Sequence, residues 1–245
     1  MPPCTRALIS VSDKAGVVEL ATRLHQLKIE ILSTGGTAVA LRQAGIPVTD
    51  VAEITGFPEI MDGRVKTLHP LIHGGLLNRG ETDAAVMNRH GIRAIDLLVV
   101  NLYPFEATTG KPGCTREDAI ENIDIGGPAM IGGGANNHDF VAVLVDPADY
   151  GRVLDELEAD GGVSTTTRRY LARKAFAHTA TYDATVWGWL RAADDDHELP
   201  TRYPIGLRLR ETLRYGENPH QRAGLYTLAG GAGDTVVGAQ LHQGK

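Results

Sequence analysis

Leu-Leu-Val-Val-Asn-Leu-Tyr, residues 97–103, is an almost unbroken apolar run. Such a run is typical of a strand in a parallel sheet whose two faces are both covered. Helical spacing of apolar residues predicts helices over 16–26 and 38–44. Further strands are predicted over 7–12, 29–33, 48–51 and 140–145. Strands that alternate with helices indicate an α/β domain with a mostly parallel sheet, and its ligands are expected beyond the carboxyl ends of the strands.

The pattern changes after residue 145. Helices are predicted over 147–157 and 165–190, with Asp146 and Ser164 as N-caps. The acidic run 194–196 and the prolines that follow it indicate a linker, and the chain then reaches a glycine-rich stretch over 230–238. We therefore expect two parts, residues 1–195 and 196–245. The second is too small to bury a core of its own, so we expect it to pack on the first domain, pair with a second chain or remain disordered.

The composition is that of an ordinary globular protein, with 245 residues, 42% apolar and 22% charged. A net charge of -6 provides no general field for nucleic acid, so an anionic ligand needs a local cluster of cations. The two cysteines form neither a metal-ligand pattern nor a disulfide framework. With no leader or membrane-spanning run in this sequence, we expect a cytoplasmic protein without nucleic-acid or membrane partners.

Two turns have the composition of phosphate-binding sites. Ser12-Asp13-Lys14 and the stretch 33–37, Ser-Thr-Gly-Gly-Thr, each lie where a predicted strand gives way to a helix. Helix N-termini present backbone N–H groups and a partial positive charge to an anion, and glycine lets the backbone approach closely. Lys14 would neutralise part of a phosphate charge. Two ordinary capped turns would have the same composition, and for the pair we weigh the two interpretations equally.

A third segment, 63–70, reads Gly-Arg-Val-Lys-Thr-Leu-His-Pro. In an extended chain Arg64 and Lys66 point to the same side, where an anion or a developing oxyanion between them would offset their repulsion. Solvated surface charges are the ordinary alternative.

Two further segments supply candidates for proton transfer. Asn101 and Tyr103 end the run quoted above, and Asp124 precedes Gly126 and Gly127. Tyr103 can donate a hydrogen bond and Asp124 can accept a proton. Taken alone, the residues favour structural roles: a Tyr packed at a strand end and an Asp that caps a helix.

Together these motifs resemble one family. SVSDK, STGGTA, TGFPE, GRVKTLHP, NLYPF and IDIGGP occur in the order and spacing of the inosine monophosphate (IMP) cyclohydrolase domain of bifunctional purine-biosynthesis proteins. The resemblance covers residues 7 to about 193. LRYGENPHQ, residues 213–221, resembles the opening of the family's second domain, the AICAR formyltransferase.

The resemblance implies a methylglyoxal-synthase-like three-layer α/β fold, followed by C-terminal helices and a short segment of the second domain. The implied reaction is dehydrative ring closure of 5-formamidoimidazole-4-carboxamide ribonucleotide (FAICAR) to IMP. It implies no metal and no organic cofactor, a small-molecule nucleotide as partner, and a homodimer.

The resemblance also assigns roles. Lys66, Tyr103 and Asp124 match three of four catalytic side chains, with Asp124 as proton acceptor and the other two stabilising the oxyanion. Arg214 and Tyr215 match nucleotide contacts of the second domain. The residues that match substrate contacts are Ser12, Lys14, Ser33, Thr34, Gly35, Gly36, Thr37, Arg64, Thr67, Asn101, Gly126 and Gly127.

The sequence departs from the family at the fourth catalytic position. Asn136 stands where the family has lysine, and Gly132 stands where it has arginine. Asparagine carries no charge and no transferable proton, and losing one oxyanion donor costs ~10²–10³ in rate. Glycines 132–134 are expected to loosen a local helix by roughly 1 kcal/mol each.

These departures leave two functions open: a slowed cyclohydrolase, and a module that binds purine nucleotides without turnover. Formyl transfer is not expected, because the family's catalytic pair for that reaction has no match within these residues. Methylglyoxal synthase shares the fold and a phosphate site, but GRVKTLHP and NLYPF argue against it.

Overall fold

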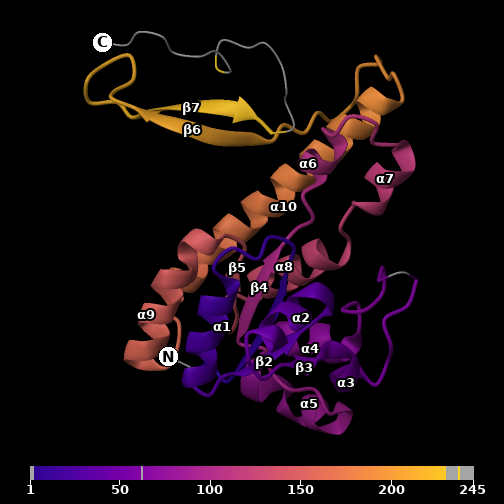
Figure 1. Ribbon diagram of the computed structural model, residues 1–245. Helices are drawn as coiled ribbons and strands as arrows, with labels where there is room; N and C mark the ends of the chain where they lie inside the picture. Colours follow the sequence, from indigo (N-terminus) through magenta and orange to yellow (C-terminus); the bar gives the residue numbers. More distant parts are fainter. Residues whose placement is uncertain (1–2, 62, 230–236, 238–245) are drawn as a thin grey trace. The chain divides into compact units, whose positions relative to one another are not determined.

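The computed structural model describes residues 3–61, 63–229 and 237. The chain forms two compact units (Figure 1). The first contains the residues up to Pro104 together with Glu121–Thr179, and the second contains Phe105–Ile120 and the residues from Ala180 onward. The units divide inside a long helix, so the expected domain boundary at residue 195 remains a prediction.

A five-stranded sheet with the order β3-β2-β1-β4-β5 forms the centre of the first unit. Every pair of neighbouring strands is parallel. The two central strands are buried on both faces, as the apolar run predicts. The strands are β1 (Arg6–Val11), β2 (Glu30–Ser33), β3 (Thr49–Asp50), β4 (Leu97–Asn101) and β5 (Ala142–Leu144).

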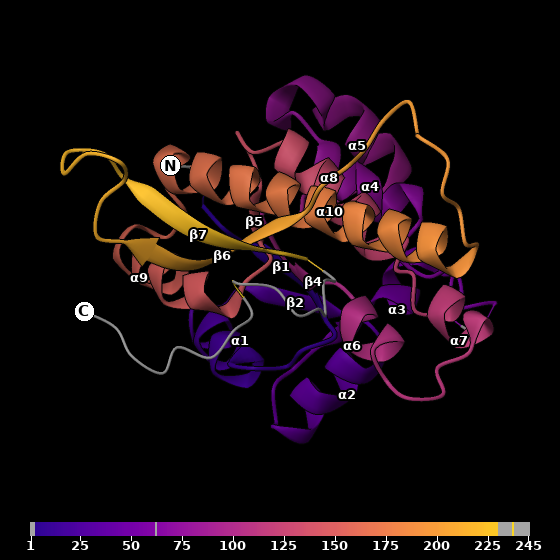
Figure 2. The same ribbon diagram turned by 90° about the horizontal axis from the view of Figure 1, so that it is seen from above.

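Helices cover both faces of this sheet. Figure 2 shows α1 (Val17–Gln26) and α2 (Gly35–Gln43) on one side of the strands, with α4 (Pro70–Leu77), α5 (Ala84–His90) and α8 (Gly126–Asn136) on the other. Apolar residues of α1 recur at helical spacing and pack with Ile9 of β1 and Val99 of β4 into the main core. The helix α9 (Tyr150–Asp160) and the start of α10 (Thr165–Ala193) contribute to the same core.

The order of the strands places the functional edge. The chain moves from β1 to β2 and β3 on one side of β1, then returns to β4 and β5 on the other side. Ligands of open α/β sheets bind at this kind of reversal, outside the carboxyl ends of the strands. Because Ile9 pairs with Ser33 and Val11 pairs with Asn101, these three strands end at one edge.

The predicted α/β class and mostly parallel sheet are confirmed, with three differences in the elements. The helix expected from residue 38 begins at Gly35. The helix expected from residue 147 begins as a 3₁₀ turn, η2 (Pro147–Asp149), before α9. Elements of the first unit not predicted from periodicity include α3 (Val51–Thr55), η1 (Gly80–Asp83), α4 and α5.

The glycines of α8 do not interrupt the helix. α8 continues through residues 132–134, and Gly134 packs so closely on the sheet that a Cβ there would lie 2.8 Å from Val143 Cγ2. A small residue at 134 is therefore required by packing on β5, which sequence periodicity did not reveal.

The second unit contains short helices and an antiparallel ribbon. The elements are α6 (Phe105–Thr109), α7 (Arg116–Glu121), β6 (Leu207–Leu213) and β7 (Ala223–Leu228). The Phe105 ring packs edge-on against Trp189, with 5.7 Å between ring centroids. Every residue of β6 is exposed, in keeping with the expectation that the tail buries no core. The glycine-rich stretch 230–238 lies outside the described residues except at 237.

Across the described ranges, no helix has the length and apolar character needed to cross a membrane.

Candidate active site at the carboxyl edge of the sheet

Two lysines meet at the start of α2. Lys66 Nζ would lie 3.8 Å from a Cβ placed on Gly35, and Lys14 Nζ would lie 3.9 Å from a Cβ placed on Gly36. Gly35 has a φ of 47°, in the left-handed region that favours glycine. The first N–H groups of an α-helix have no partner within the helix and attract anions. We call Lys14, Gly35, Gly36 and Lys66 the candidate anion site.

The hydroxyl groups beside this site point into the fold. Ser33 Oγ donates to the carbonyl of Ile9 at 2.7 Å. Thr37 Oγ1 donates to the carbonyl of Val11 at 2.9 Å and accepts from the Val11 N–H at 3.1 Å. These hydroxyls hold the start of α2 against β1, so backbone N–H groups are what this segment offers an anion. The assignment of Ser33, Thr34 and Thr37 as substrate contacts stays a prediction.

Asn101 holds the turn that follows β1. Its Oδ1 accepts from the N–H of Ser12 at 2.6 Å and from the N–H of Asp13 at 3.0 Å. Its Nδ2 donates to the carbonyl of Asp13 at 2.8 Å. The turn that carries Lys14 is thereby tied to the end of β4.

The segment around Arg64 is a turn rather than an extended chain. Ile60 and Val65 form an antiparallel bridge, and Gly63 has a φ of 88°. Arg64 pairs with Glu121 through two hydrogen bonds. The expectation that Arg64 and Lys66 project side by side from an extended chain is therefore wrong, because the chain reverses here and each cation has its own carboxylate.

Glu59 is the carboxylate beside Lys66, with 3.5 Å between Oε1 and Nζ. A Cβ on Gly63 would lie 2.4 Å from the same Oε1, so any larger residue at 63 would displace this carboxylate. Glu59 belongs to the TGFPE motif that resembles the family, but it was not among the predicted site residues. The pairing depends on the path of residues 59–66, and no local pattern in the sequence indicates it.

Asp124 combines a structural and a chemical feature. Its Oδ1 accepts from the N–H of Gly127 at 2.8 Å, as expected of an Asp that caps the start of α8. Burial raises the pKa of the Asp124 carboxyl, while N–H groups of Gly127 and Tyr103 and the charge of Lys66 partly oppose that rise. A carboxyl group with a raised pKa is a better proton acceptor than an ordinary aspartate.

The glycines after Asp124 allow a close approach. A Cβ on Gly127 would lie 2.6 Å from Leu102 Cδ2 and 2.7 Å from Asp124 Oδ2. A Cβ on Gly126 would lie 3.0 Å from Thr67 Oγ1. Larger residues here would push α8 away from the end of β4 and shift the carboxyl group.

Tyr103 has an open environment. It follows β4, and 41% of its surface is exposed. Its exposed side chain differs from a Tyr packed at a strand end, and its backbone N–H hydrogen-bonds the Asp124 carboxyl group. A catalytic role for the phenol stays a prediction.

Asn136 lies far from these residues. It is the last residue of α8 and is exposed, whereas Asp124 precedes the first residue of that helix. The helix has 11 residues, so its ends are about 15 Å apart at 1.5 Å per residue. The structure therefore brings Lys66, Tyr103 and Asp124 to one edge but does not bring Asn136 to them within one chain.

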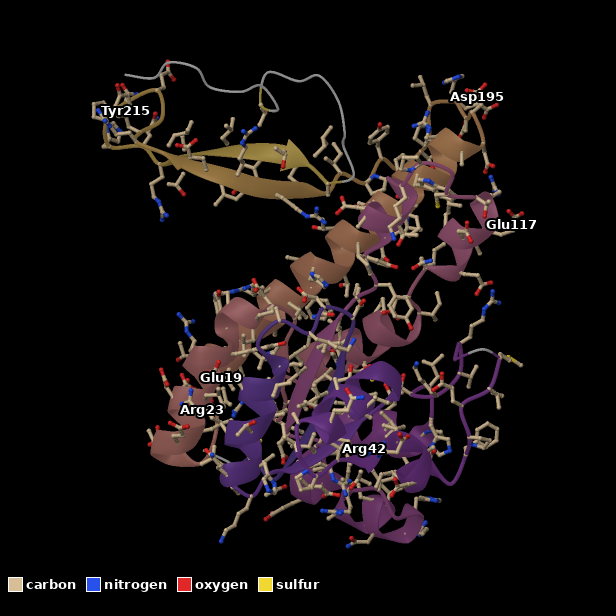
Figure 3. All side chains as sticks on the ribbon, viewed as in Figure 1. Glu19, Arg23, Arg42, Glu117, Asp195 and Tyr215 are labelled. Carbon is tan, nitrogen blue, oxygen red and sulfur yellow. The ribbon has the colours of Figure 1, made fainter. Side chains whose placement is uncertain are left out.

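Arg214 and Tyr215 belong to the second unit. Both are exposed in the loop that joins β6 to β7, where the side chain of Tyr215 is labelled (Figure 3). A hydrogen bond of 2.9 Å from the N–H of Gly216 to the carbonyl of Gln221 closes this loop. Their assignment as nucleotide contacts stays a prediction.

Within the described residues, no group of three or more His, Cys, Asp or Glu side chains is arranged to hold a metal ion.

The fold and this edge define an α/β protein with a candidate anion site and a half-buried carboxyl group at one end of its sheet. Residues 16–129 match the family described as MGS-like domain, and residues 134–245 match the family described as AICARFT/IMPCHase bienzyme. The chain belongs to the AICARFT/IMPCHase bienzyme family and contains its MGS-like domain.

Individual relatives agree with this family. The chain is 53% identical to the bifunctional purine biosynthesis protein PurH of Neisseria gonorrhoeae (strain NCCP11945), over 98% of this chain and 48% of that protein. It is 55% identical to the protein of the same name from Jannaschia sp. (strain CCS1), over 99% of this chain and 46% of that protein. The chain thus spans about half the length of these curated relatives.

A solved structure shares the fold as well. The crystal structure of ForH matches with a TM-score of 0.68 and 38% sequence identity, over 76% of this chain and 98% of that chain.

Proposed function

We propose that this chain catalyses the dehydrative ring closure of FAICAR to IMP. The observation that carries the proposal is the position of Lys66. Its ammonium group lies over Gly35 at the start of α2, and its charge also acts on the carboxyl group of Asp124. Lys66 thus lies between the candidate anion site and the proposed proton acceptor. A substrate with a phosphate at one end and the reacting groups at the other requires both sites.

The candidate anion site takes the ribose phosphate in this proposal. An ammonium group lies beside each of the two glycines that begin α2, and charge-assisted hydrogen bonds to phosphate are among the stronger polar contacts. Holding the phosphate fixes the rest of the substrate against the sheet edge. Ring closure joins two groups of one molecule, so a reactive pose supplies much of the rate enhancement.

Asp124 and its neighbours act on the reacting groups. The carboxamide nitrogen forms a bond to the formyl carbon and loses a proton to the Asp124 carboxylate. The formyl oxygen becomes negative, is stabilised by donors from Lys66 and Tyr103, and takes up a proton. The hydroxyl group then leaves as water together with the proton of the formamido nitrogen, which gives IMP.

The alternative of a nucleotide-binding module without turnover rested on Asn136 and on the short match to the second domain, of which only Asn136 concerns this site. Because Asn136 lies about 15 Å along α8 from the Asp124 end, its identity gives no reason to expect a defective site within one chain. The enzyme is therefore the function that we retain.

We also propose the cell compartment and the partners of this chain. Cys4 and Cys114 are free thiols, as a reducing cytoplasm keeps them. We place the chain there, acting on a small-molecule nucleotide as a homodimer, without nucleic acid, membrane or cofactor.

Formation of IMP from FAICAR, measured against the uncatalysed rate, tests the function. Turnover well above that rate is expected for the unaltered chain. Lys66→Met should remove most of it, while the matched control Lys111→Met, at an exposed lysine of the second unit, should not. A rate equal to the uncatalysed one in the unaltered chain would refute the proposal.

A further inference from the structure

Asn101 uses most of its hydrogen-bonding capacity on the turn after β1. An asparagine side chain has two lone pairs on oxygen and two N–H donors. Both lone pairs face the turn, at 2.6 Å from the Ser12 nitrogen and 3.0 Å from the Asp13 nitrogen. One N–H donates to the carbonyl of Asp13 at 2.8 Å. At most one N–H remains for a substrate.

The strand register puts Asn101 in this position. Val11 and Asn101 are paired residues of neighbouring parallel strands, so the side chain at 101 lies next to the residues that follow Val11. The turn is also held from the other side, because the buried Thr37 hydroxyl bonds both the N–H and the carbonyl of Val11. β4 and α2 thus hold the residues that place Lys14.

Lys14 depends on this turn. Its Nζ donates to the carbonyl of Ser12 at 3.3 Å and lies over Gly36 in the candidate anion site. A shift of Ser12 and Asp13 would move the ammonium group with them.

We infer that Asn101 is a positioning residue for phosphate binding: it fixes the Ser12–Lys14 turn, and does not recognise the ring of the substrate. The inference rests on the proposed function, since it assigns the phosphate to the candidate anion site. It replaces the direct substrate contact that the resemblance implied for Asn101.

Binding of IMP, which has a base, and of ribose 5-phosphate, which has none, distinguishes the turn role of Asn101 from a contact with the ring. If Asn101 acts through the turn, Asn101→Ala weakens binding of ribose 5-phosphate and of IMP by the same factor, about tenfold for the loss of a small set of neutral hydrogen bonds. If Asn101 contacts the ring, only IMP binding weakens. Titration calorimetry with both ligands on the full chain measures this. A loss confined to IMP would overturn the inference.

The division of the effect between KM and kcat gives a second measurement, which a loss of stability alone would not change. For the turn role, Asn101→Ala raises KM for FAICAR about tenfold, while kcat of the saturated enzyme stays within about twofold. A lower kcat at unchanged KM would place Asn101 at the reacting groups and refute the inference. Amide exchange should rise at Ser12 and Asp13, and unchanged exchange there would also refute it.

Thr37 supplies a conservative pair in case Asn101→Ala does not fold. Thr37→Val removes the hydroxyl that bonds Val11, and should weaken both ligands equally, whereas Thr37→Ser keeps the hydroxyl and should restore binding. Thr37→Val with unchanged affinity for ribose 5-phosphate would contradict control of the anion site through this turn. Failure of the unaltered chain to bind either ligand would instead refute the proposed function.

Discussion

Asp124 is the residue at which the structural and chemical demands on this site meet. Its carboxyl group accepts N–H groups that fix the start of α8 against the end of β4. The same enclosure raises its pKa through burial. Glycine at 127 is required for this arrangement, because a side chain there would collide with the carboxyl group itself.

Asp124→Asn should lower kcat for ring closure by about 10²–10⁴, the usual contribution of a general base. The amide keeps the size of the side chain and cannot take up the carboxamide proton. Rates of IMP formation at saturating substrate measure the effect, with the exposed Asp139→Asn as a control that should not change them. A loss of less than tenfold would assign proton transfer to another group.

The rate should also depend on pH through Asp124. The carboxylate form is the proton acceptor, and burial raises the pKa of this group, so kcat/KM should fall with decreasing pH at values above the ordinary aspartate pKa of about 3.9. Lys66→Met should move this acid limb to higher pH, since the Lys66 charge lowers the pKa. A limb at or below the ordinary value would contradict the role.

The raised pKa of Asp124 also determines how the free energy of unfolding changes with pH. A carboxyl group whose pKa is raised on folding binds its proton more readily in the folded chain. Its contribution to the free energy of unfolding therefore falls as pH rises from the unfolded pKa through the folded pKa. In the proposed mechanism, Asp124 therefore serves as proton acceptor at the cost of some stability near neutral pH.

Among the secondary-structure elements, the strands were predicted from apolar runs in the sequence. The packing of α8 on the sheet was not. Runs such as residues 97–103 are visible in the sequence because a strand buried on both faces has no polar positions. The helix α8 has little such signal, and one of its glycines, Gly134, serves close packing on Leu98 and Val143. The expectation that glycines 132–134 loosen the helix was based on helix propensity alone.

Part of the candidate site followed from the same reasoning. Segments that end neighbouring parallel strands must meet at one edge, which placed Lys14, Gly35 and Asn101 together. The partners of Arg64 and Lys66 could not be predicted, because they depend on an irregular turn. The direction of the Asn101 amide is set by the pairing of β1 with β4, which periodicity does not report.

The glycines of α8 allow a direct test of packing against propensity. A Cβ on Gly133 would make ordinary contact at 3.8 Å with Leu77, whereas one on Gly134 would lie 2.8 Å from Val143 and 3.3 Å from Leu98. Gly133→Ala should therefore raise the free energy of unfolding by about 1 kcal/mol, as helix propensity dictates. Gly134→Ala should lower it by roughly 1–3 kcal/mol through overpacking.

Urea denaturation of both variants measures these changes. Stabilisation by both would show that α8 can move away from the sheet at no cost. Destabilisation by both would mean that the groove between α8 and α4 is as tightly packed as the contact with β5.

For the whole molecule, the net charge of -6 means that anion binding must come from a local arrangement. Lys14 and Lys66, which are 52 residues apart in the chain, both lie beside the glycines that begin α2 and would provide it. Lys66, Tyr103, Asp124 and both candidate anion-site glycines lie in the first unit. The residues to which the proposed function assigns phosphate binding and proton transfer therefore all lie in the first unit.

The position of Asn136 leads to the last prediction. Asn136→Lys restores the residue that the resemblance expects, but at the far end of α8, about 15 Å from the Asp124 end. An ammonium group there is too distant to stabilise an oxyanion beside Asp124 of the same chain, because such stabilisation requires contact at hydrogen-bond distance. Asn136→Lys should thus change kcat for ring closure by less than about twofold when each chain acts alone.

A clear rise in kcat would mean that residue 136 acts in the site of a second copy, and that rise should grow with protein concentration. Mixing chains decides the matter. Chains that carry both Asp124→Asn and Asn136→Lys lack a proton acceptor, so their own sites should be inactive. Added to unaltered chains, they can raise the rate only if their new lysine reaches an unaltered site. A rate per unaltered chain that rises with added variant would show action across copies, whereas the single-chain arrangement predicts an unchanged rate.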